Sequence, residues 1–314
     1  MDAALIRRRL AGAGRVAACA AAAGGAALAY GALVERHLFS LREETLPILP
    51  PGRRPLKLLH LSDIHLVPGQ KLKQKWLRSL ADTRPDLVVN TGDNLSHHQA
   101  VPPLLDALDP LLEFPGVFVP GSNDYYAPVA KNPFTYFTGP SKPPTDYGSR
   151  ELPWRRMHSA FGNSGWIDLS NRHQSLVVDG LRLDFTGVDD PHLGRDRYSG
   201  FPRGSASADQ AAHLRIAVAH APYQRVLDYF TDGGAELILA GHTHGGQVCV
   251  PGYGALVSNC DLPTWRARGL TWWEHAGRQV PLNVSAGIGT SRMAPVRFAC
   301  RPEAVLLSLV AKPS

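Results

Sequence analysis

Five short polar clusters in this 314-residue sequence contain side chains of the kinds that bind transition metals. Each cluster follows an apolar run of strand length, and together they supply carboxylates, imidazoles and amides. Carboxylate oxygens and imidazole nitrogens in combination suit Mn²⁺, Fe or Zn²⁺. The sequence therefore predicts a metal centre built from Asp63-Ile64-His65, Gly92-Asp93-Asn94, Gly121-Ser122-Asn123-Asp124, His220 and Gly241-His242-Thr243-His244.

The order and spacing of the clusters carry more weight than any one of them. In an extended segment, alternate side chains point the same way, so Asp63 and His65 share one side, as do His242 and His244. A single His-x-His pair occurs more often in packing or at the surface than at a metal. Five such clusters in succession, each ending an apolar run, indicate a functional site.

The elements that must position these clusters read as an α/β domain. Apolar runs predict strands, and helix-like segments lie between several of them, which indicates a largely parallel sheet. Ligands bind such sheets at the carboxyl ends of their strands, where the clusters fall. The expected strands are 56–61, 86–90, 117–120, 214–219 and 236–240, and the expected helices are 71–81, 102–113 and 222–231. A second group with β-branched alternation predicts strands at 174–178, 181–186, 247–250, 282–285 and 304–310.

Over roughly residues 56–310 the sequence resembles the calcineurin-like metallophosphoesterases, whose pattern D-x-H, G-D, G-N-H-D/E, H, G-H-x-H the five clusters meet in order. The sequence motifs at 241–247 (GHTHGGQ) and 187–191 (GVDDP) resemble those of the bacterial exported or membrane-anchored branch. The resemblance implies a four-layer α/β/β/α sandwich, in agreement with the two groups of strands.

The resemblance also implies roles for individual residues and a cofactor of two divalent metal ions, Mn, Fe or Zn. Asp93 would bridge the two ions, so it must be a carboxylate. A hydroxide shared by two such ions can attack phosphorus at neutral pH. The implied ligands of the first ion are Asp63, His65 and His244, and those of the second are Asn123, His220 and His242.

The third cluster departs from the family pattern. Aligned without a gap, Ser122 takes the place of the ligand asparagine and Asn123 that of the histidine that supports the leaving group. A shift of one residue gives Asn123 the ligand role and puts Asp124 in the histidine's place, and we prefer this shift because an amide oxygen binds metals better than a hydroxyl. His98 is a second candidate for the missing imidazole, with an exposed loop histidine as the alternative.

The first 42 residues predict a membrane anchor that precedes the domain as one hydrophobic helix. An uncharged run of 19 residues, 16–34, follows four arginines and is about long enough to span a bilayer. The positive-inside rule then puts the catalytic domain on the extracytoplasmic side. A cleaved export signal is the alternative, since Arg8 and Arg9 resemble a twin-arginine signal.

Residues 43–55, with four prolines among them, predict an extended linker, and 56–314 the catalytic domain. The aromatic-rich, proline-rich segment 125–152 predicts an ordered lid or a packed surface loop. The net charge of +6 is concentrated before residue 43, which argues against nucleic-acid binding. The three cysteines after residue 240 leave a disulfide and buried thiols equally open.

These features predict a divalent-metal-dependent hydrolase of phosphoester or pyrophosphate bonds at a membrane. The anchor and the lid suggest a lipid-linked or nucleotide-sugar-lipid substrate as a further hypothesis. The altered third cluster keeps an alternative open, a catalytically impaired metal-binding protein of the same fold that acts as a binding or scaffold module. A mononuclear hydrolase would leave one of the paired motifs unused. Serine-hydrolase and P-loop motifs are absent from the sequence.

Overall fold

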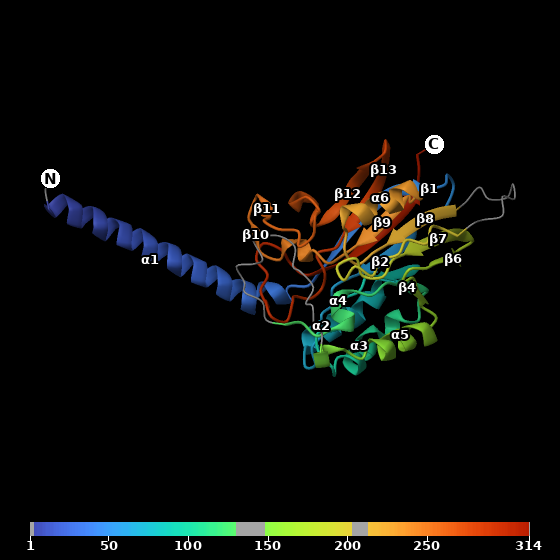
Figure 1. Cartoon of the computed structure of the whole chain (residues 1–314), viewed down its shortest axis with the longest axis horizontal. Helices are drawn as coiled ribbons and strands as arrows, with labels where there is room; N and C mark the ends of the chain where they lie inside the picture. The colour runs from blue at the N-terminus through green and yellow to red at the C-terminus, as the bar shows by residue number, and fades with distance from the viewer. Residues whose placement is uncertain (1–2, 130–147, 203–212, 314) are drawn as a thin grey trace.

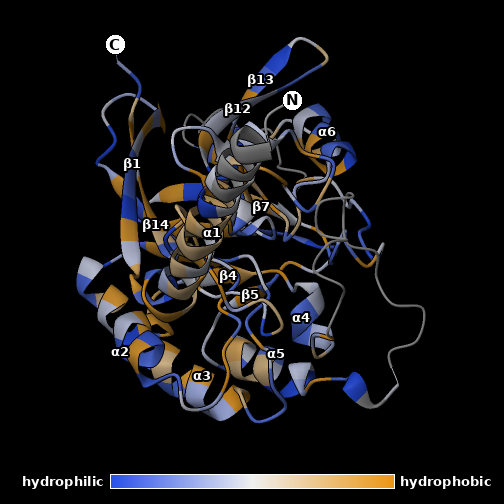
Figure 2. Ribbon diagram, turned by 90° about the vertical axis from the view of Figure 1, so that its left-hand side faces the viewer, coloured by the Kyte–Doolittle hydropathy of each residue, from blue (hydrophilic) through white to orange (hydrophobic). Residues whose placement is uncertain are grey.

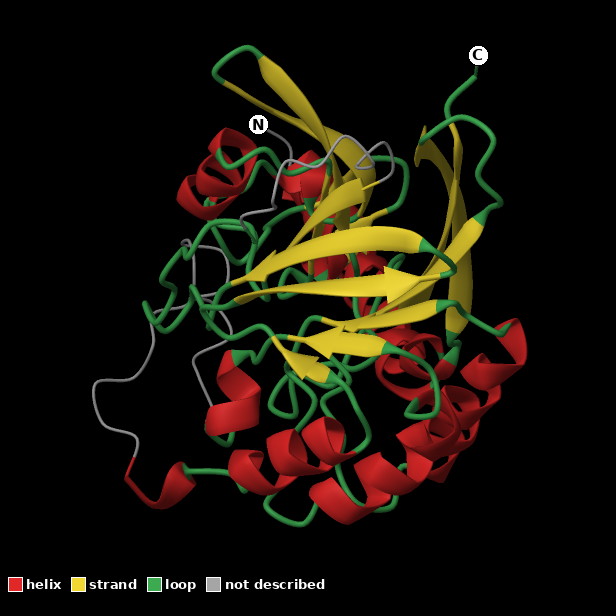
Figure 3. Cartoon of the chain, turned by 90° about the vertical axis from the view of Figure 1, so that its right-hand side faces the viewer, coloured by secondary structure: helices red, strands yellow, loops and turns green. Residues whose placement is uncertain are grey.

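A computed structural model describes residues 3–129, 148–202 and 213–313 of the chain. Two six-stranded sheets face each other, with helices on the outside of both (Figures 1 and 3). The first sheet has the order β1-β14-β2-β3-β4-β5, and the second has the order β12-β13-β9-β8-β7-β6. This arrangement confirms the four-layer α/β/β/α sandwich.

The first sheet is parallel except where β14 meets β2. Its strands are β1 (Ser40–Leu49), β2 (Leu56–Leu61), β3 (Leu87–Asn90), β4 (Gly116–Phe118), β5 (Ile167–Asp168) and β14 (Glu303–Ala311). The second sheet has a parallel centre and two antiparallel edge pairs. Its strands are β6 (His173–Val178), β7 (Leu181–Gly187), β8 (His213–Val218), β9 (Leu237–Ala240), β12 (Gly269–His275) and β13 (Arg278–Val284). A separate hairpin pairs β10 (Cys249–Val250) with β11 (Gly254–Ala255).

The α-helices are α1 (Ala3–Leu33), α2 (Lys71–Ser79), α3 (Val101–Leu108), α4 (Ser122–Tyr125), α5 (Trp154–Asn163) and α6 (Gln224–Asp232). Short 3₁₀ turns add η1 (Glu35–His37), η2 (Leu80–Thr83), η3 (Asp109–Leu111), η5 (Gly148–Arg150), η6 (His244–Gly246) and η7 (Thr264–Arg266). The helices α2, α3 and α5 pack on the first sheet, and α6 packs on the second.

Alternation along the strands divides the apolar side chains among three cores. In β2, Leu58 lies in the core between the two sheets with Phe185 of β7. Leu59, its neighbour, points the other way and packs in the core under α2 and α3. The third core joins Phe230 of α6 to the outer face of the second sheet. Both faces of each sheet are therefore buried, as parallel strands require.

The sequence predictions for the ten strands and three helices each meet an observed element, with boundaries that differ by a few residues. These elements could be predicted because most of the strands are continuous apolar runs that end at polar clusters. Six helices and strands were missed: α4, α5, β1, β5, β11 and β12. Part of the predicted lid, 130–147, lies outside the described residues.

The predicted linker at 43–55 is wrong over residues 43–49. These residues belong to β1, which pairs in parallel with β14 at the edge of the first sheet. Leu46, Ile48 and Leu49 are buried there, whereas Pro47 is exposed. An edge strand tolerates proline because its outer N–H groups need no partner, which is why the prolines did not exclude a strand. The domain boundary moves from residue 56 to residue 40.

The N-terminal helix α1 projects from the domain (Figure 1) and is largely apolar along its length (Figure 2). Residues Gly14–His37 are long and apolar enough to cross a membrane, and only 6% of the most apolar part is buried. Its last turn contacts the domain, since the carbonyl of Gly31 accepts a hydrogen bond from the Arg297 amide at 3.2 Å. The buried Glu35 carboxylate then accepts hydrogen bonds from the amides of Ala299 and Cys300. The helix is thus attached directly, without a linker.

The four cysteines are free thiols in the structure. Cys19 is exposed on α1, and Cys249, Cys260 and Cys300 are buried. The sequence left open a disulfide or buried thiols for the three C-terminal cysteines, and the structure has buried thiols.

We predict that Leu49→Ala lowers the free energy of unfolding by about 2–4 kcal/mol, because it removes a fully buried side chain from the core between the sheets. Thr45→Ala, on the exposed side of β1, should change it by less than about 0.5 kcal/mol. Chemical denaturation of the full-length parent and both variants measures the difference. Equal stability of the two variants would mean that β1 is a linker after all.

Candidate metal centre

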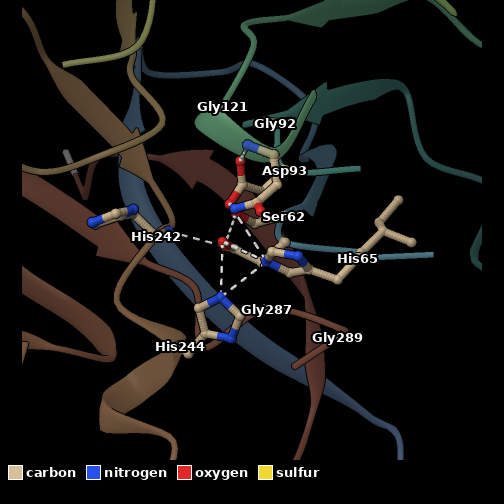
Figure 4. Close-up of polar contacts among 12 residues, drawn as sticks. Ser62, His65, Gly92, Asp93, Gly121, His242, His244, Gly287 and Gly289 are labelled. Carbon is tan, nitrogen blue, oxygen red and sulfur yellow. Dashed lines mark hydrogen bonds and ion pairs between the residues drawn. The ribbon is translucent and has the colours of Figure 1, made fainter. Parts of the chain in front are cut away.

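The five clusters meet at one edge of the two sheets, on loops that follow β2, β3, β4, β8 and β9 (Figure 4). Backbone hydrogen bonds join these loops to one another. The amides of Asp63 and His65 donate to the carbonyls of Gly92 and Asp93, both at 2.9 Å, and the amide of Gly241 donates to the carbonyl of His220 at 2.8 Å. The convergence follows from the sheet, because parallel strands end at the same edge.

Five of the seven candidate ligands share an uncommon backbone conformation. A positive φ is found in only a few per cent of non-glycine residues, and it clusters at functional sites because the surrounding structure must hold it. The extended D-x-H and H-x-H geometry that we expected is therefore replaced by left-handed turns. The residues are Asp63 (φ 49°), His65 (φ 45°), Asp93 (φ 56°), His242 (φ 67°) and His244 (φ 51°).

Asp63, His65 and His244 form one group that could hold a metal ion. The Nε2 atoms of the two histidines lie 3.1 Å apart, and Asp63 Oδ1 lies 3.4 Å from His244 Nε2. Within the described chain, Asp63 Oδ1 is buried without a hydrogen-bond partner. An unpaired buried carboxylate oxygen is costly, and a cation would satisfy it. The donor set thus fits a divalent metal.

Asp93, His220 and Asp63 form a second group. Asp93 Oδ2 lies 3.5 Å from His220 Nε2 and 3.4 Å from His65 Nε2, so one carboxylate oxygen faces both groups. His242 adds its Nδ1 atom, 3.3 Å from His220 Nε2. The two groups share Asp63 and are joined by Asp93, which is the arrangement that a pair of metal ions needs.

Asn123 lies beside Asp93. Its backbone amide donates to Asp93 Oδ1 and its side-chain Nδ2 to Asp93 Oδ2, both at 2.7 Å. The oxygen and nitrogen of an amide exchange places by a half-turn of the side chain. These contacts put the Asn123 amide next to the second group, and its role as a metal ligand stays a prediction.

Burial and mutual charge set the protonation of the groups. Burial lowers the pKa of His65 to about 4 and holds the pKa values of His242 and His244 well below the usual range. These imidazoles are neutral at pH 7 and present lone pairs to a metal. Burial also opposes charge on His220, but the carboxylate of Asp93 outweighs it and raises its pKa well above the usual value. Metal binding at His220 must displace that proton.

Two glycines permit the loops to approach this closely. A Cβ at Gly121 would overlap the Asp93 carboxylate and lie 2.8 Å from the His220 ring. A Cβ at Gly241 would lie 2.5 Å from Asp63 Oδ2. Both positions must therefore lack a side chain.

Asp124 is held by backbone hydrogen bonds at the base of the site. It is fully buried, and its carboxylate accepts hydrogen bonds from the backbone amides of Gly121, Asp93 and Asn94 at 2.7–2.9 Å. Both oxygens are occupied in holding two loops together. These contacts indicate a structural role for the Asp124 carboxylate, and its catalytic role stays a prediction that they do not support.

His98 is exposed and lines a surface depression of about 600 Å³ together with Glu151, Leu152, Pro153, Arg155 and Arg156. None of these residues belongs to the two donor groups. The geometry thus gives no support to a catalytic role for His98, which stays a prediction.

Arg297 is a residue of the site that sequence reasoning missed. It is fully buried, and its guanidinium donates to the carbonyls of Ala286, Gly287 and Gly289 and to that of His244 at 3.3 Å. The nearby Lys73, also buried, donates to the carbonyl of Ile64 at 2.7 Å, and burial lowers its pKa to about 7. Neither residue belongs to a motif, so no signal in a single sequence could have found them.

We predict that Arg297→Met lowers the free energy of unfolding by about 3 kcal/mol or more, because several buried carbonyls lose their donors. Metal affinity should fall as well, since the loop that carries His244 loses its support. Thermal melting and metal titration measure both effects, with the exposed Arg301→Met as the matched control. Indistinguishable behaviour of the two variants would exclude this role for Arg297.

Asp190 predicts a pH dependence of the metal-free protein. It is fully buried, and burial raises its pKa to about 7. Between its unfolded pKa of about 4 and about 7, the folded state binds more protons, so stability falls as pH rises. Asp190→Asn should remove a loss on the order of 4 kcal/mol between about pH 4 and about pH 8. Denaturant unfolding of metal-stripped protein at both pH values tests this, and an equal loss in parent and variant would refute it.

A family model described as calcineurin-like phosphoesterase matches residues 56–246, more than half of the chain. The chain is 28% identical over 307 residues to the uncharacterized metallophosphoesterase YkuE of Bacillus subtilis, with 94% of each chain covered. It is 24% identical over 278 residues to the phosphodiesterase YaeI of Escherichia coli, with 87% of this chain and 88% of that one covered. A Bos taurus transmembrane protein with a metallophosphoesterase domain is 28% identical over 211 residues, 64% of this chain and 43% of its own length. This chain therefore belongs to the calcineurin-like phosphoesterase family and is a metal-dependent phosphoesterase.

Proposed function

We propose that the chain hydrolyses phosphoester or pyrophosphate bonds with two divalent cations at the edge shared by its two sheets. The observation that carries the proposal is the sharing of Asp63 between two donor groups whose atoms lie within 4.8 Å of one another. Asp63, His65 and His244 would hold the first ion. Asp93 would bridge, and Asn123, His220 and His242 would complete the second position.

When bound, two such cations activate water as a nucleophile and stabilise negative charge on the phosphoryl group. The chain's own contribution is to hold the donors in place before metal arrives. His65 Nδ1 lies 3.0 Å from the Ser96 hydroxyl, and the His220 Nδ1 atom lies 2.7 Å from the Thr91 carbonyl. Each contact fixes the ring so that Nε2 faces the site.

The donor chemistry supports Mn²⁺, Fe or Zn²⁺. Both groups contain only carboxylate oxygens and imidazole nitrogens, with no thiolate among them. Such mixed oxygen and nitrogen sets suit first-row transition metals over Mg²⁺ or Ca²⁺, which prefer oxygen alone.

The neighbours of the bridging carboxylate favour substrates with a stable leaving group. Asn123, which contacts Asp93, is an amide and has no titratable proton to give. The oxygens of Asp124 are occupied by backbone amides. The leaving group of a pyrophosphate or of an acidic diester departs without protonation, so we propose these substrates over alkyl monoesters.

The proposed location is a membrane, with α1 as a single span and the catalytic domain on the extracytoplasmic side. The arginines that precede the apolar run support this orientation. The direct contacts of Gly31 and Glu35 with the domain support an uncleaved anchor over an exported, cleaved form, because cleavage would remove these partners. A lipid-linked substrate is the finer proposal, supported by the attachment of the domain to α1 without a linker.

We predict that Asp93→Asn lowers kcat on an aryl phosphodiester by roughly 10²–10⁴-fold, since it removes the bridging charge worth several kcal/mol. The assay uses full-length protein, stripped of metal and reloaded with Mn²⁺. The exposed Asp82→Asn should match the parent.

Metal content measured together with turnover distinguishes the two candidate functions. A chain that binds metal but does not turn over any of the substrates would be a binding module. Two ions per chain with turnover that is lost in Asp93→Asn supports the hydrolase. Two ions per chain with no turnover of aryl diester, aryl monoester or pyrophosphate would favour the binding module, for which the absence of a histidine from residues 121–124 is the specific observation.

A further inference from the structure

The last turn of α1 fixes the depth of one loop of the domain relative to the apolar span. Gly31 lies inside the apolar stretch Gly14–His37, and its carbonyl accepts the Arg297 amide. The Tyr30 ring meets the Phe298 ring edge-on, with centroids 6.4 Å apart. Gly31 lies two residues before the end of α1 at Leu33, so the loop at 294–300 meets the helix in its last turn.

The hairpin of β10 and β11 is bonded to this same loop. The amide of Cys249 donates to the carbonyl of Phe298 at 2.8 Å, and the amide of Phe298 donates to the carbonyl of Gln247 at 3.0 Å. The Gln247 side chain also donates to the carbonyl of Ala294 at 2.9 Å. Figure 1 shows the hairpin on the side of the domain from which α1 emerges. The hairpin is therefore held at the level of the helix exit.

Large apolar side chains are exposed on this hairpin and the adjoining loop. We refer to these five residues as the apolar tip: Val248 (37% exposed), Val250 (44%), Tyr253 (75%), Leu256 (43%) and Met293 (47%). Gathered exposed apolar side chains mark a binding surface. Tyrosine with aliphatic neighbours is typical of residues at a membrane–water interface.

The charge of the same segments suits an anionic surface. Residues 245–260 and 286–302 contain no Asp or Glu, whereas the second segment contains Arg292, Arg297 and Arg301. Arg297 is buried, which leaves Arg301 exposed and Arg292 beside Met293. Basic residues at the headgroup level gain attraction from anionic lipids.

We propose that the apolar tip lies in the lipid interface next to α1, so that the chain meets the membrane through a second surface besides its span. The inference rests on the proposed role of α1 as an anchor. The occupant of the surface is the lipid headgroup region, since the tip adjoins the exit of the apolar helix and lacks acidic residues.

The placement gives the metal centre a fixed relation to the bilayer. His244 begins η6, which leads within five residues into β10. The Cys300 thiol, from the loop that contacts α1, donates to the carbonyl of His244 at 3.4 Å. The loop that carries His244 and the hairpin of the apolar tip are therefore both bonded to the loop at 294–300.

The test uses the full chain in vesicles of phosphatidylcholine and phosphatidylglycerol. Tyr253→Cys and Val177→Cys, each with Cys19→Ser, are labelled with a polarity-sensitive thiol dye. Val177 is the matched control because it is 66% exposed on β6, away from α1 (Figure 1). The Cys19→Ser parent retains the three buried cysteines, so its labelling gives the background that these cysteines contribute. Quenching by lipid-borne nitroxide should be roughly threefold stronger at position 253 than at 177.

Equal quenching at the two positions, in protein that floats with the vesicles, would overturn the apolar tip while the anchor stands. Failure to float would overturn both the anchor and the tip. Turnover of a soluble aryl diester by the same labelled proteins reports on the hydrolase proposal separately. Loss of that turnover in both variants and the parent, with quenching at 253 intact, would count against the hydrolase and leave the membrane surface in place.

Discussion

Two carboxylates, Asp63 and Asp93, are buried close together where the loops of the two sheets meet, and the rest of the site depends on the charge that they carry. Burial and the nearby Asp93 raise the pKa of Asp63 to about 6, whereas His220 outweighs burial at Asp93 and holds its pKa well below the usual range. Two like charges at this depth require cations. The positive-φ turns, the glycines and the neutral imidazoles all belong to the loops that close around these two carboxylates.

A second set of buried charges holds the scaffold outside the donors. Glu303 begins β14 and is fully buried, and its carboxylate pairs with Arg42 of β1 at 3.2 Å and with Arg268. It also accepts the amide of Ala286 at 3.0 Å. The Glu35 carboxylate likewise accepts hydrogen bonds from the backbone amides of the loop at 299–300. Each of these carboxylates fastens an N-terminal element to the C-terminal loops that carry Arg297, so the first sheet's edge strand belongs to the support of the site.

The sequence predicted what is encoded locally. Asp63, Asp93, His220 and His242 each follow an apolar run, so the strands and the polar side chains that meet at their ends could be recognised. Long-range contacts were not predictable. The strand β1 gains its burial from β14, more than 250 residues later, and its prolines argued for a linker. Asp124 and Asn123 differ by one position in a loop, where no periodicity fixes the register.

Arg297 links the N-terminal helix α1 to the loop that carries His244. Its backbone amide donates to Gly31 in the last turn of α1, while its guanidinium donates to the carbonyl of His244. A soluble enzyme could be tethered by a flexible segment and sample many orientations. Here the helix, the 294–300 loop and the donor loop are hydrogen-bonded in sequence, so the orientation of the metal centre relative to α1 is set by the fold. With α1 in its proposed role as an anchor, an enzyme held in this way would suit substrates that lie in the plane of the membrane, since these arrive at a constant height.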